Sequence, residues 1–190
     1  MVKQRACPRW RATCSFTGMA TDMLVLLERC RALEEMAATV YEILARRFVG
    51  DGELTALWSA MARDEHTHAR KLGTWRELMA AEPADHRPQA SGFDSGVTEV
   101  ELLLKESRTA AATADEEEAF AIALAMENSE LDVIYTTLLQ SSPIARYPEL
   151  ADTVRHETAG HHQKLLEMVG RRCRGEKTLL RAALLAGHHH

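Results

Sequence analysis

The sequence predicts an all-α protein, a four-helix bundle with a long crossover between its second and third helices. Apolar residues recur at spacings of three and four in four long segments, and no region keeps the alternation of a strand. A short link joins the first two segments, a long crossover joins the second to the third, and a short link joins the last two. This connectivity is typical of a bundle made of two helix pairs. With 190 residues, 46% of them hydrophobic, the chain can bury a single core.

Three regions are expected along the chain. Residues 1–20 lack periodicity and are predicted to be a poorly ordered leader, residues 21–170 form the bundle, and residues 171–190 form a basic C-terminal tail. The chain ends in three histidines after a glycine, the pattern of a purification tag, so these three are set aside as ligands.

Composition excludes several classes of partner. A net charge of -5 gives no reason to expect nucleic acid. No apolar run approaches the roughly 20 residues of a membrane span, and the amino terminus has no apolar signal segment. The four cysteines form no Cys-x-x-Cys pair, which excludes a zinc ribbon or a rubredoxin-type iron centre. The sequence therefore predicts a cytoplasmic protein without a nucleic-acid or membrane partner.

The first helix is predicted from about Asp22 to Phe48. Its apolar seam is interrupted once, by Glu34, whereas Glu35 falls on the solvent side. The seam consists of Leu27, Cys30, Glu34, Ala37, Tyr41, Leu44 and Phe48.

A Gly-Asp-Gly turn at residues 50–52 leads into the second helix, which is predicted to end near Ala81. Glu65 and His68 lie one turn apart on its buried side. The full seam is Trp58, Met61, Glu65, His68, Leu72, Trp75 and Met79.

The crossover begins with residues 82–96, which are too polar and too rich in Pro and Gly to be helical. A shorter helix is expected over residues 97–114. Asp115 then opens the third long helix, predicted through residue 139, with acids at the positive end of its dipole. Its seam is Phe120, Leu124, Glu127, Leu131, Ile134 and Leu138, with Glu130 on the same side.

The fourth helix follows a proline-containing turn at residues 141–148 and carries Glu157 and His161. Four residues bring these two side chains within about 40° of each other on one face, so His161 is preferred to His162 as the partner of Glu157. His66, His156 and His162 are expected to be solvated. The seam is Leu150, Val154, Glu157, His161, Leu165 and Met168.

All four seams break near mid-helix at residues of metal-ligand type. Each residue alone has an ordinary explanation, as a surface acid or, for Tyr41 and Tyr135, as a core aromatic. Together they place five or six carboxylates in one core, where acids need cations among them. Two metal ions are the simplest cations, and carboxylates with imidazoles but without thiolate favour iron or manganese.

These motifs resemble rubrerythrin and its ferritin-like relatives over roughly residues 22–170. The resemblance rests on Glu34 followed by Tyr41, on DEHTHARKL with Glu65-x-x-His68, and on ENSELDVIY with Glu127, Glu130 and Tyr135. The fourth helix departs from the family pattern of Glu-x-x-His, because Gly160 stands three residues after Glu157. A rubredoxin domain is also missing.

The resemblance implies a ligand set and roles for its members. Glu65 and Glu157 would bridge two irons, Glu34 and Glu127 would be terminal ligands, and Glu130 and His68 would exchange at one iron as its redox state changes. Tyr41, Tyr135 and Glu130 would then be the residues that take part in the catalytic reaction. The metal ligands expected are Glu34, Glu65, His68, Glu127, Glu130, Glu157 and His161.

The leading hypothesis for function is a rubrerythrin-like peroxidase that reduces hydrogen peroxide in oxidative-stress defence. Electrons would come from a separate donor such as a rubredoxin, and a homodimer is implied. One alternative is a ferroxidase or iron-handling protein that uses dioxygen; another is a non-enzymatic helical module with a vestigial site. Di-iron hydroxylases and manganese catalases share the same core and stay open as well. Cys173, within RRCRG, is expected to be a solvated bystander.

Overall fold

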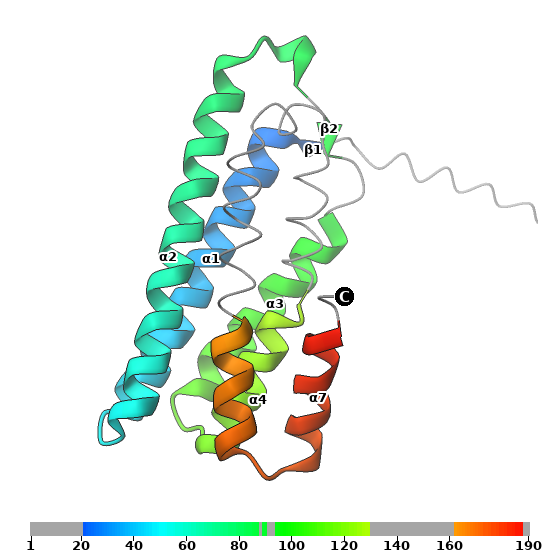
Figure 1. Cartoon of the computed structure of the whole chain (residues 1–190). Helices are drawn as coiled ribbons and strands as arrows, with labels where there is room; N and C mark the ends of the chain where they lie inside the picture. The colour runs from blue at the N-terminus through cyan, green and yellow to red at the C-terminus, as the bar shows by residue number, and fades with distance from the viewer. Residues whose placement is uncertain (1–20, 88, 91–93, 130–161, 188–190) are drawn as a thin grey trace, which may run out of the picture.

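The computed structural model describes residues 21–87, 89–90, 94–129 and 162–187, and its main feature is a long helical hairpin. Helix α1 (Met23–Arg47) and helix α2 (Gly52–Ala81) run side by side along the length of α1, and α2 extends beyond it (Figure 1). Both lie within a residue or two of their predicted bounds. This hairpin supplies the framework against which the other helices pack.

Aspartates fix where the two long helices start. The Asp22 side chain accepts a hydrogen bond from the Leu24 backbone N–H at 2.9 Å. Asp51 accepts from the N–H groups of Glu53 and Leu54, both at 3.1 Å. Because the first N–H groups of a helix have no partner within it, these short acidic side chains stabilise both starts.

The crossover connects α2 to α4 (Glu116–Glu127) through several short elements. A 3₁₀ turn, η1 (Ala84–His86), precedes strand β2 (Gln89–Ala90), which pairs antiparallel with β1 (Thr21–Asp22) just before α1. Helix α3 (Asp94–Ala111) follows and packs against α1 and α4. It begins and ends three residues earlier than predicted. The helical connectivity confirms the expected all-α class with a long crossover.

Helix α4 starts as predicted but ends earlier. Asp115 and Glu118 form a reciprocal capping box, with Asp115 accepting from the Glu118 N–H at 2.9 Å and Glu118 accepting from the Asp115 N–H at 3.0 Å. The sequence predicts an unbroken helix through residue 139, yet α4 stops at Glu127.

Two polar side chains account for that early end. Asn128 Nδ2 donates to the Leu124 carbonyl at 2.7 Å, and Ser129 Oγ donates to the Met126 carbonyl at 2.5 Å. Side chains that bond nearby backbone carbonyls offer the chain an alternative to continued helix. The apolar seam that predicts a continuous helix takes no account of this local competition.

At one end of the bundle, Arg172 joins three helical segments. It closes the helix over residues 162–172, drawn in orange in Figure 1. Its guanidinium contacts Asp51 at 2.7 Å, Glu53 at 3.2 Å and Glu116 at 2.7 Å. These hydrogen bonds, Glu116 first and Asp51 next, raise the pKa of Arg172. The contacts fix the end of this segment against the starts of α2 and α4.

A further helix follows where the sequence suggested only a basic tail. Helix α7 (Glu176–Gly187) packs against α4 (Figure 1). Cys173, expected to be solvated, is instead only 2% exposed. Burial, with the nearby charges of Glu117 and Glu116, raises the pKa of its thiol to about 11. The expectation of an exposed thiol was wrong because the chain turns back over α4 at this point.

The core confirms the predicted seams of α1, α2 and the described part of the third long helix. Its centre is aromatic: Tyr41 stacks on Trp58 with ring centroids 6.0 Å apart, and Phe120 contacts Trp58 at 5.3 Å. All three side chains are fully buried, so one aromatic group ties α1, α2 and α4 together. None of the helices in the described ranges has the length and apolarity to cross a membrane.

Candidate metal centre

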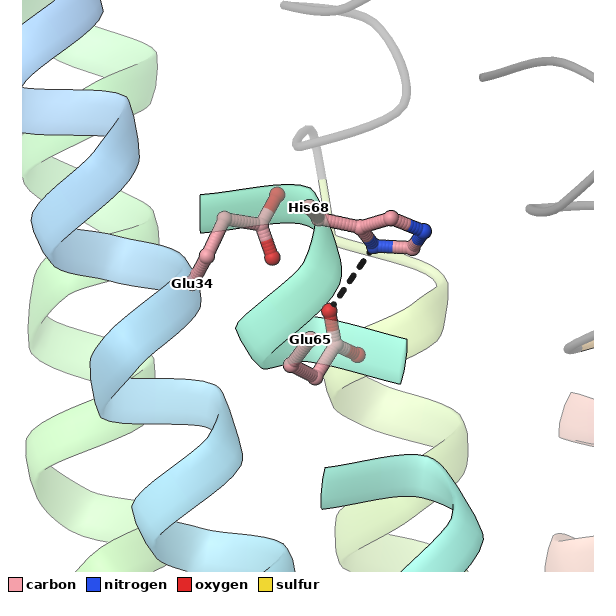
Figure 2. Close-up of side chains that lie close together, drawn as sticks. All are labelled: Glu34, Glu65 and His68. Carbon is pink, nitrogen blue, oxygen red and sulfur yellow. Dashed lines mark hydrogen bonds and ion pairs between the residues drawn. The ribbon is translucent and has the colours of Figure 1, made fainter. Parts of the chain in front are cut away.

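Three predicted ligands, Glu34, Glu65 and His68, meet in the interior of the α1–α2 hairpin. Glu34 projects from α1 toward the pair on α2 (Figure 2). Each offers one possible ligand atom, and these atoms all lie within 4.8 Å of one another. The residues are 2%, 5% and 6% exposed. Side chains of this type are seldom so deeply buried without a specific partner.

Helix geometry explains how α2 supplies two of these ligands. Glu65 and His68 are three residues apart, so their side chains project from the same side of successive turns. His68 Nδ1 lies 3.1 Å from Glu65 Oε2, the contact drawn as a dashed line in Figure 2. That contact holds the imidazole ring beside the carboxylate.

A second group of polar side chains is centred on Glu127, the last residue of α4. Tyr41 donates a hydrogen bond from its hydroxyl to Glu127 Oε1 at 2.5 Å. His162 Nε2 lies 2.9 Å from the other oxygen, Oε2. The Glu127 side chain is 8% exposed and that of His162 is 2% exposed. This carboxylate therefore contacts a phenol on one side and an imidazole on the other.

Tyr41 is influenced by carboxylates of both groups. Burial is the largest cause of a pKa well above the usual range for this phenol, followed by the negative charge of Glu127. The charges of Glu65 and Glu34 raise the pKa further. Carboxylates from both groups therefore act on a single hydroxyl, which stays protonated and serves as a hydrogen-bond donor.

The donor set fits the metals that the sequence predicts. Carboxylate oxygens and imidazole nitrogens suit iron and manganese, whereas soft metals prefer thiolates. Cys30 lies one turn before Glu34, but burial, with the charge of Glu34, raises the pKa of its thiol to about 12. A thiol that stays protonated is a poor ligand. The residues at this centre therefore offer hard and intermediate donors.

The described residues test only part of the predicted ligand set. Glu34, Glu65, His68 and Glu127 lie in the described helices, as does Tyr41, and they form the two groups above. The remaining predicted site residues lie outside the described residues and stay predictions: Glu130, Tyr135, Glu157 and His161.

His162 corrects one expectation from the sequence. It was expected to be solvated, yet it is 1% exposed and contacts Glu127. His162, Leu165 and Val169 are all buried and follow one another at spacings of three and four. They define the inward face of the helix over residues 162–172. The sequence held an indication that His162 is buried. Val169 lies seven residues after His162, so the two share one face of the helix, and this apolar residue could have placed His162 on the buried side.

Comparisons with known proteins give one match. The model of the family described as Rubrerythrin matches residues 26–130, more than half of the chain. No curated protein and no solved structure shows significant similarity to the chain. The matched range contains Glu34, Tyr41, Glu65, His68 and Glu127. The chain therefore belongs to the rubrerythrin family, whose domain is a ferritin-like helical bundle.

Proposed function

We propose that this protein holds two iron ions and reduces hydrogen peroxide in the cytoplasm, with electrons from an external donor protein such as a rubredoxin. The observation that carries the proposal is the buried convergence of Glu34, Glu65 and His68 within 4.8 Å. The Glu127–His162 pair, which Tyr41 contacts through Glu127, offers further ligand atoms for a second ion. A pair of iron ions would supply the two electrons needed to break the O–O bond of peroxide.

The described side chains divide into two holding sets. Glu34, Glu65 and His68 would hold one ion, and Glu127 with His162 would hold the other. His162 enters here as a ligand candidate because it is buried beside Glu127. Manganese fits the same donors and is distinguished by metal analysis.

Tyr41 fixes the orientation of a ligand rather than binding metal itself. Its hydroxyl donates to Glu127 Oε1, which leaves Oε2 on the side of His162. The ring is in turn held by stacking on Trp58. Partners of this kind hold a ligand in one rotamer, and their loss typically lowers metal affinity or activity by about 10–100-fold.

Burial around the centre keeps bulk water away from the reacting groups. Trp58 and Phe120 are fully buried on the side of Tyr41, and Cys30 is 1% exposed beside Glu34. Water exclusion strengthens electrostatic interactions inside a site and suppresses side reactions. In this setting Glu130 is proposed to exchange with His68 as a ligand, as the family resemblance implies.

The test compares two oxidants on one preparation. The protein is loaded with ferrous iron without oxygen, its iron content is measured, and it is mixed with hydrogen peroxide or dioxygen in a stopped-flow spectrometer. We expect two irons per chain and much faster oxidation by peroxide. Glu130→Ala should slow the peroxide reaction more than it weakens metal binding, whereas Glu35→Ala, on the exposed side of α1, should change neither.

Other outcomes would replace the proposal. A saturating content of one ion or none would contradict the di-iron centre. If dioxygen reacts as fast as peroxide, and added ferrous iron is turned over to a ferric product, the protein is a ferroxidase or iron-handling protein. Preferential retention of manganese would point instead to a manganese enzyme.

A further inference from the structure

Helix α7 exposes large apolar side chains on its outer side. Leu180 is 62% exposed and Leu184 is 57% exposed, and their spacing of four places both on one side of the helix. Thr178 and Ala182 are 3% and 8% exposed and lie on the side opposite Leu180, toward α4. The two leucines therefore point away from α4 and toward solvent.

Leu179, at 41% exposure, widens this apolar surface. At about 100° per residue, Leu179 lies about 100° from Leu180 on one side, and Leu184 lies about 40° from it on the other. We call these three residues the leucine ridge. They are three of the seven exposed large hydrophobic side chains in the described ranges, although α7 has only 12 residues. Such a concentration indicates a surface that contacts something apolar.

Positive charge borders one side of the leucine ridge. Lys177 lies about 60° and Arg181 about 100° from Leu180, both beyond Leu184. Both are exposed, and neither has an ion pair with the described residues. Glu176 is the acid nearest the ridge along α7, and it stands in the first turn, where an acid stabilises the helix dipole. The long basic side chains can keep their stems on the ridge and their charges beyond it.

The residues just before α7 add to this positive charge. Residues 171–181 contain five basic residues and one acid, in a chain whose net charge is -5. Arg171 is paired with Glu53, and Arg172 with acids of α2 and α4. Arg174 is exposed and donates to the backbone carbonyl of Cys173, so its charge is not offset by an acid there. The positive charge that lacks an acid partner in this region therefore lies beside the leucine ridge.

We propose that α7 docks this protein on the surface of an anionic phospholipid bilayer, with the helix lying in the plane of the headgroups. The leucine ridge enters the boundary between headgroups and acyl chains, and Lys177 and Arg181 contact lipid phosphates. A bilayer fits better than a protein partner, because it accepts a convex ridge without a groove of complementary shape and supplies negative charge along the edge of that ridge.

This proposal revises the expectation that the chain has no membrane partner. That expectation rested on the lack of an apolar run long enough to span a bilayer. A helix that lies in the interface needs no such run, because only one of its faces enters the apolar layer. The proposal does not depend on the metal or on the reaction.

Flotation of the full chain with lipid vesicles measures this docking, at mildly alkaline pH so that exposed histidines are uncharged. We expect binding to vesicles that mix phosphatidylglycerol with phosphatidylcholine, and much weaker binding to phosphatidylcholine alone. High salt should release the protein, because it screens the contacts between exposed charges.

Substitutions on α7 test the two contributions separately. Leu180→Glu or Leu184→Glu should lower the partition coefficient at least about tenfold, because each replaces an apolar contact with a charge that the lipids repel. Lys177→Gln should lower it about fivefold. Arg181→Gln should have a smaller effect, since Arg181 already donates to the Ala121 carbonyl at 3.4 Å.

Two variants away from α7 are matched controls. Val25→Glu changes a side chain that is 51% exposed in the first turn of α1. Arg63→Gln removes an exposed positive charge from α2, which lies across the molecule from α7 (Figure 1). Both variants should bind vesicles as the wild type does, and circular dichroism verifies that every variant is folded.

Three results would overturn the proposal. If the wild type does not bind the anionic vesicles, a protein partner is left as the occupant of the leucine ridge. If both leucine variants bind as the wild type does, a different surface contacts the lipid. If neutral and anionic vesicles bind equally well, the basic side chains have no part in docking.

Discussion

Two clusters of acidic side chains, one in the middle of the bundle and one at its end, have different basic side chains as partners. At the end, Asp51, Glu53 and Glu116 surround the guanidinium of Arg172. These carboxylates are between 34% and 45% exposed, and Arg172 is 25% exposed. Guanidinium keeps its charge at all physiological pH values and has no lone pair for a metal.

In the middle, the partners of the acids are imidazoles. His68 lies against Glu65, and His162 lies against Glu127, with all four side chains at most 8% exposed. Imidazole can lose its proton and bind a metal through the same nitrogen. The end cluster is therefore a permanent set of ion pairs that organises helices, whereas the central cluster can exchange its proton for a metal ion.

The largest expected effect separates a central acid from an exposed neighbour. Glu65→Ala should abolish metal binding, a loss of at least about a hundredfold in affinity, because it removes a buried ligand. Glu35→Ala should leave binding unchanged, since Glu35 is 44% exposed and contacts His66 at 2.9 Å. Elemental analysis after equilibration with ferrous iron measures both. Equal loss of metal in the two variants would mean that the middle cluster is not the binding site.

Two buried thiols report separately on the two clusters. Cys30 lies beside Glu34, and Cys173 lies beside Glu117 near the bundle end. Metal binding should slow alkylation of Cys30 at least about tenfold, because it stabilises the local folded state, and should leave Cys173 unchanged. Residue-resolved mass spectrometry measures the two rates. Equal slowing at both thiols would show that the clusters do not act independently.

The smallest expected effect is on stability at the bundle end. Arg172→Met should lower the midpoint of thermal unfolding by about 2–4 °C, because partly exposed ion pairs contribute little each. Iron content should not change. Arg171→Met is the control: Arg171 is 62% exposed, contacts Glu53 at 2.8 Å and should give a smaller shift. A loss of metal in the Arg172 variant would contradict the separation of the two clusters.

The same variant predicts a pH dependence with a definite sign. The hydrogen bond from Arg172 is the largest cause that lowers the pKa of Glu116 below its usual 4.5. Because the folded pKa is the lower one, this stabilisation is present above pH 4.5 and is lost as the pH falls through the folded value. The stability difference between wild type and Arg172→Met should therefore shrink in acid. Urea unfolding of the metal-free proteins over a pH series tests it.

The bounds of α1 and α2 and the burial of Glu34, Glu65 and His68 could be predicted, because they depend on sequence patterns within a single helix. The capping aspartates mark the starts of α1 and α2, and one helical phase places Glu34 inside and Glu35 outside. Glu65 and His68 follow from the same phase on α2. In these long helices a single register holds from end to end, so periodicity alone identifies the buried residues.

The rest depends on contacts between distant residues. His161 and His162 are adjacent, and only the packing of Leu165 and Val169 shows which way the helix over 162–172 faces. Helix α7 was missed because a run of arginines before it suggested a tail, although Arg172 is bound by acids from two other helices. The end of α4 depends on side-chain hydrogen bonds that apolar periodicity does not detect.

The early end of α4 has a consequence for how the centre would fill. Glu34, Glu65 and His68 lie inside helices of 25 and 30 residues, so their backbones are held on both sides. Glu127 is the final residue of its helix, and its carboxylate is held by contacts with Tyr41 and His162. One half of the centre is thus positioned by two long helices, and the other depends on contacts between side chains of different segments. Metal uptake is therefore expected to be stepwise, with the hairpin side, where three ligand atoms already lie within 4.8 Å of one another, capturing an ion first.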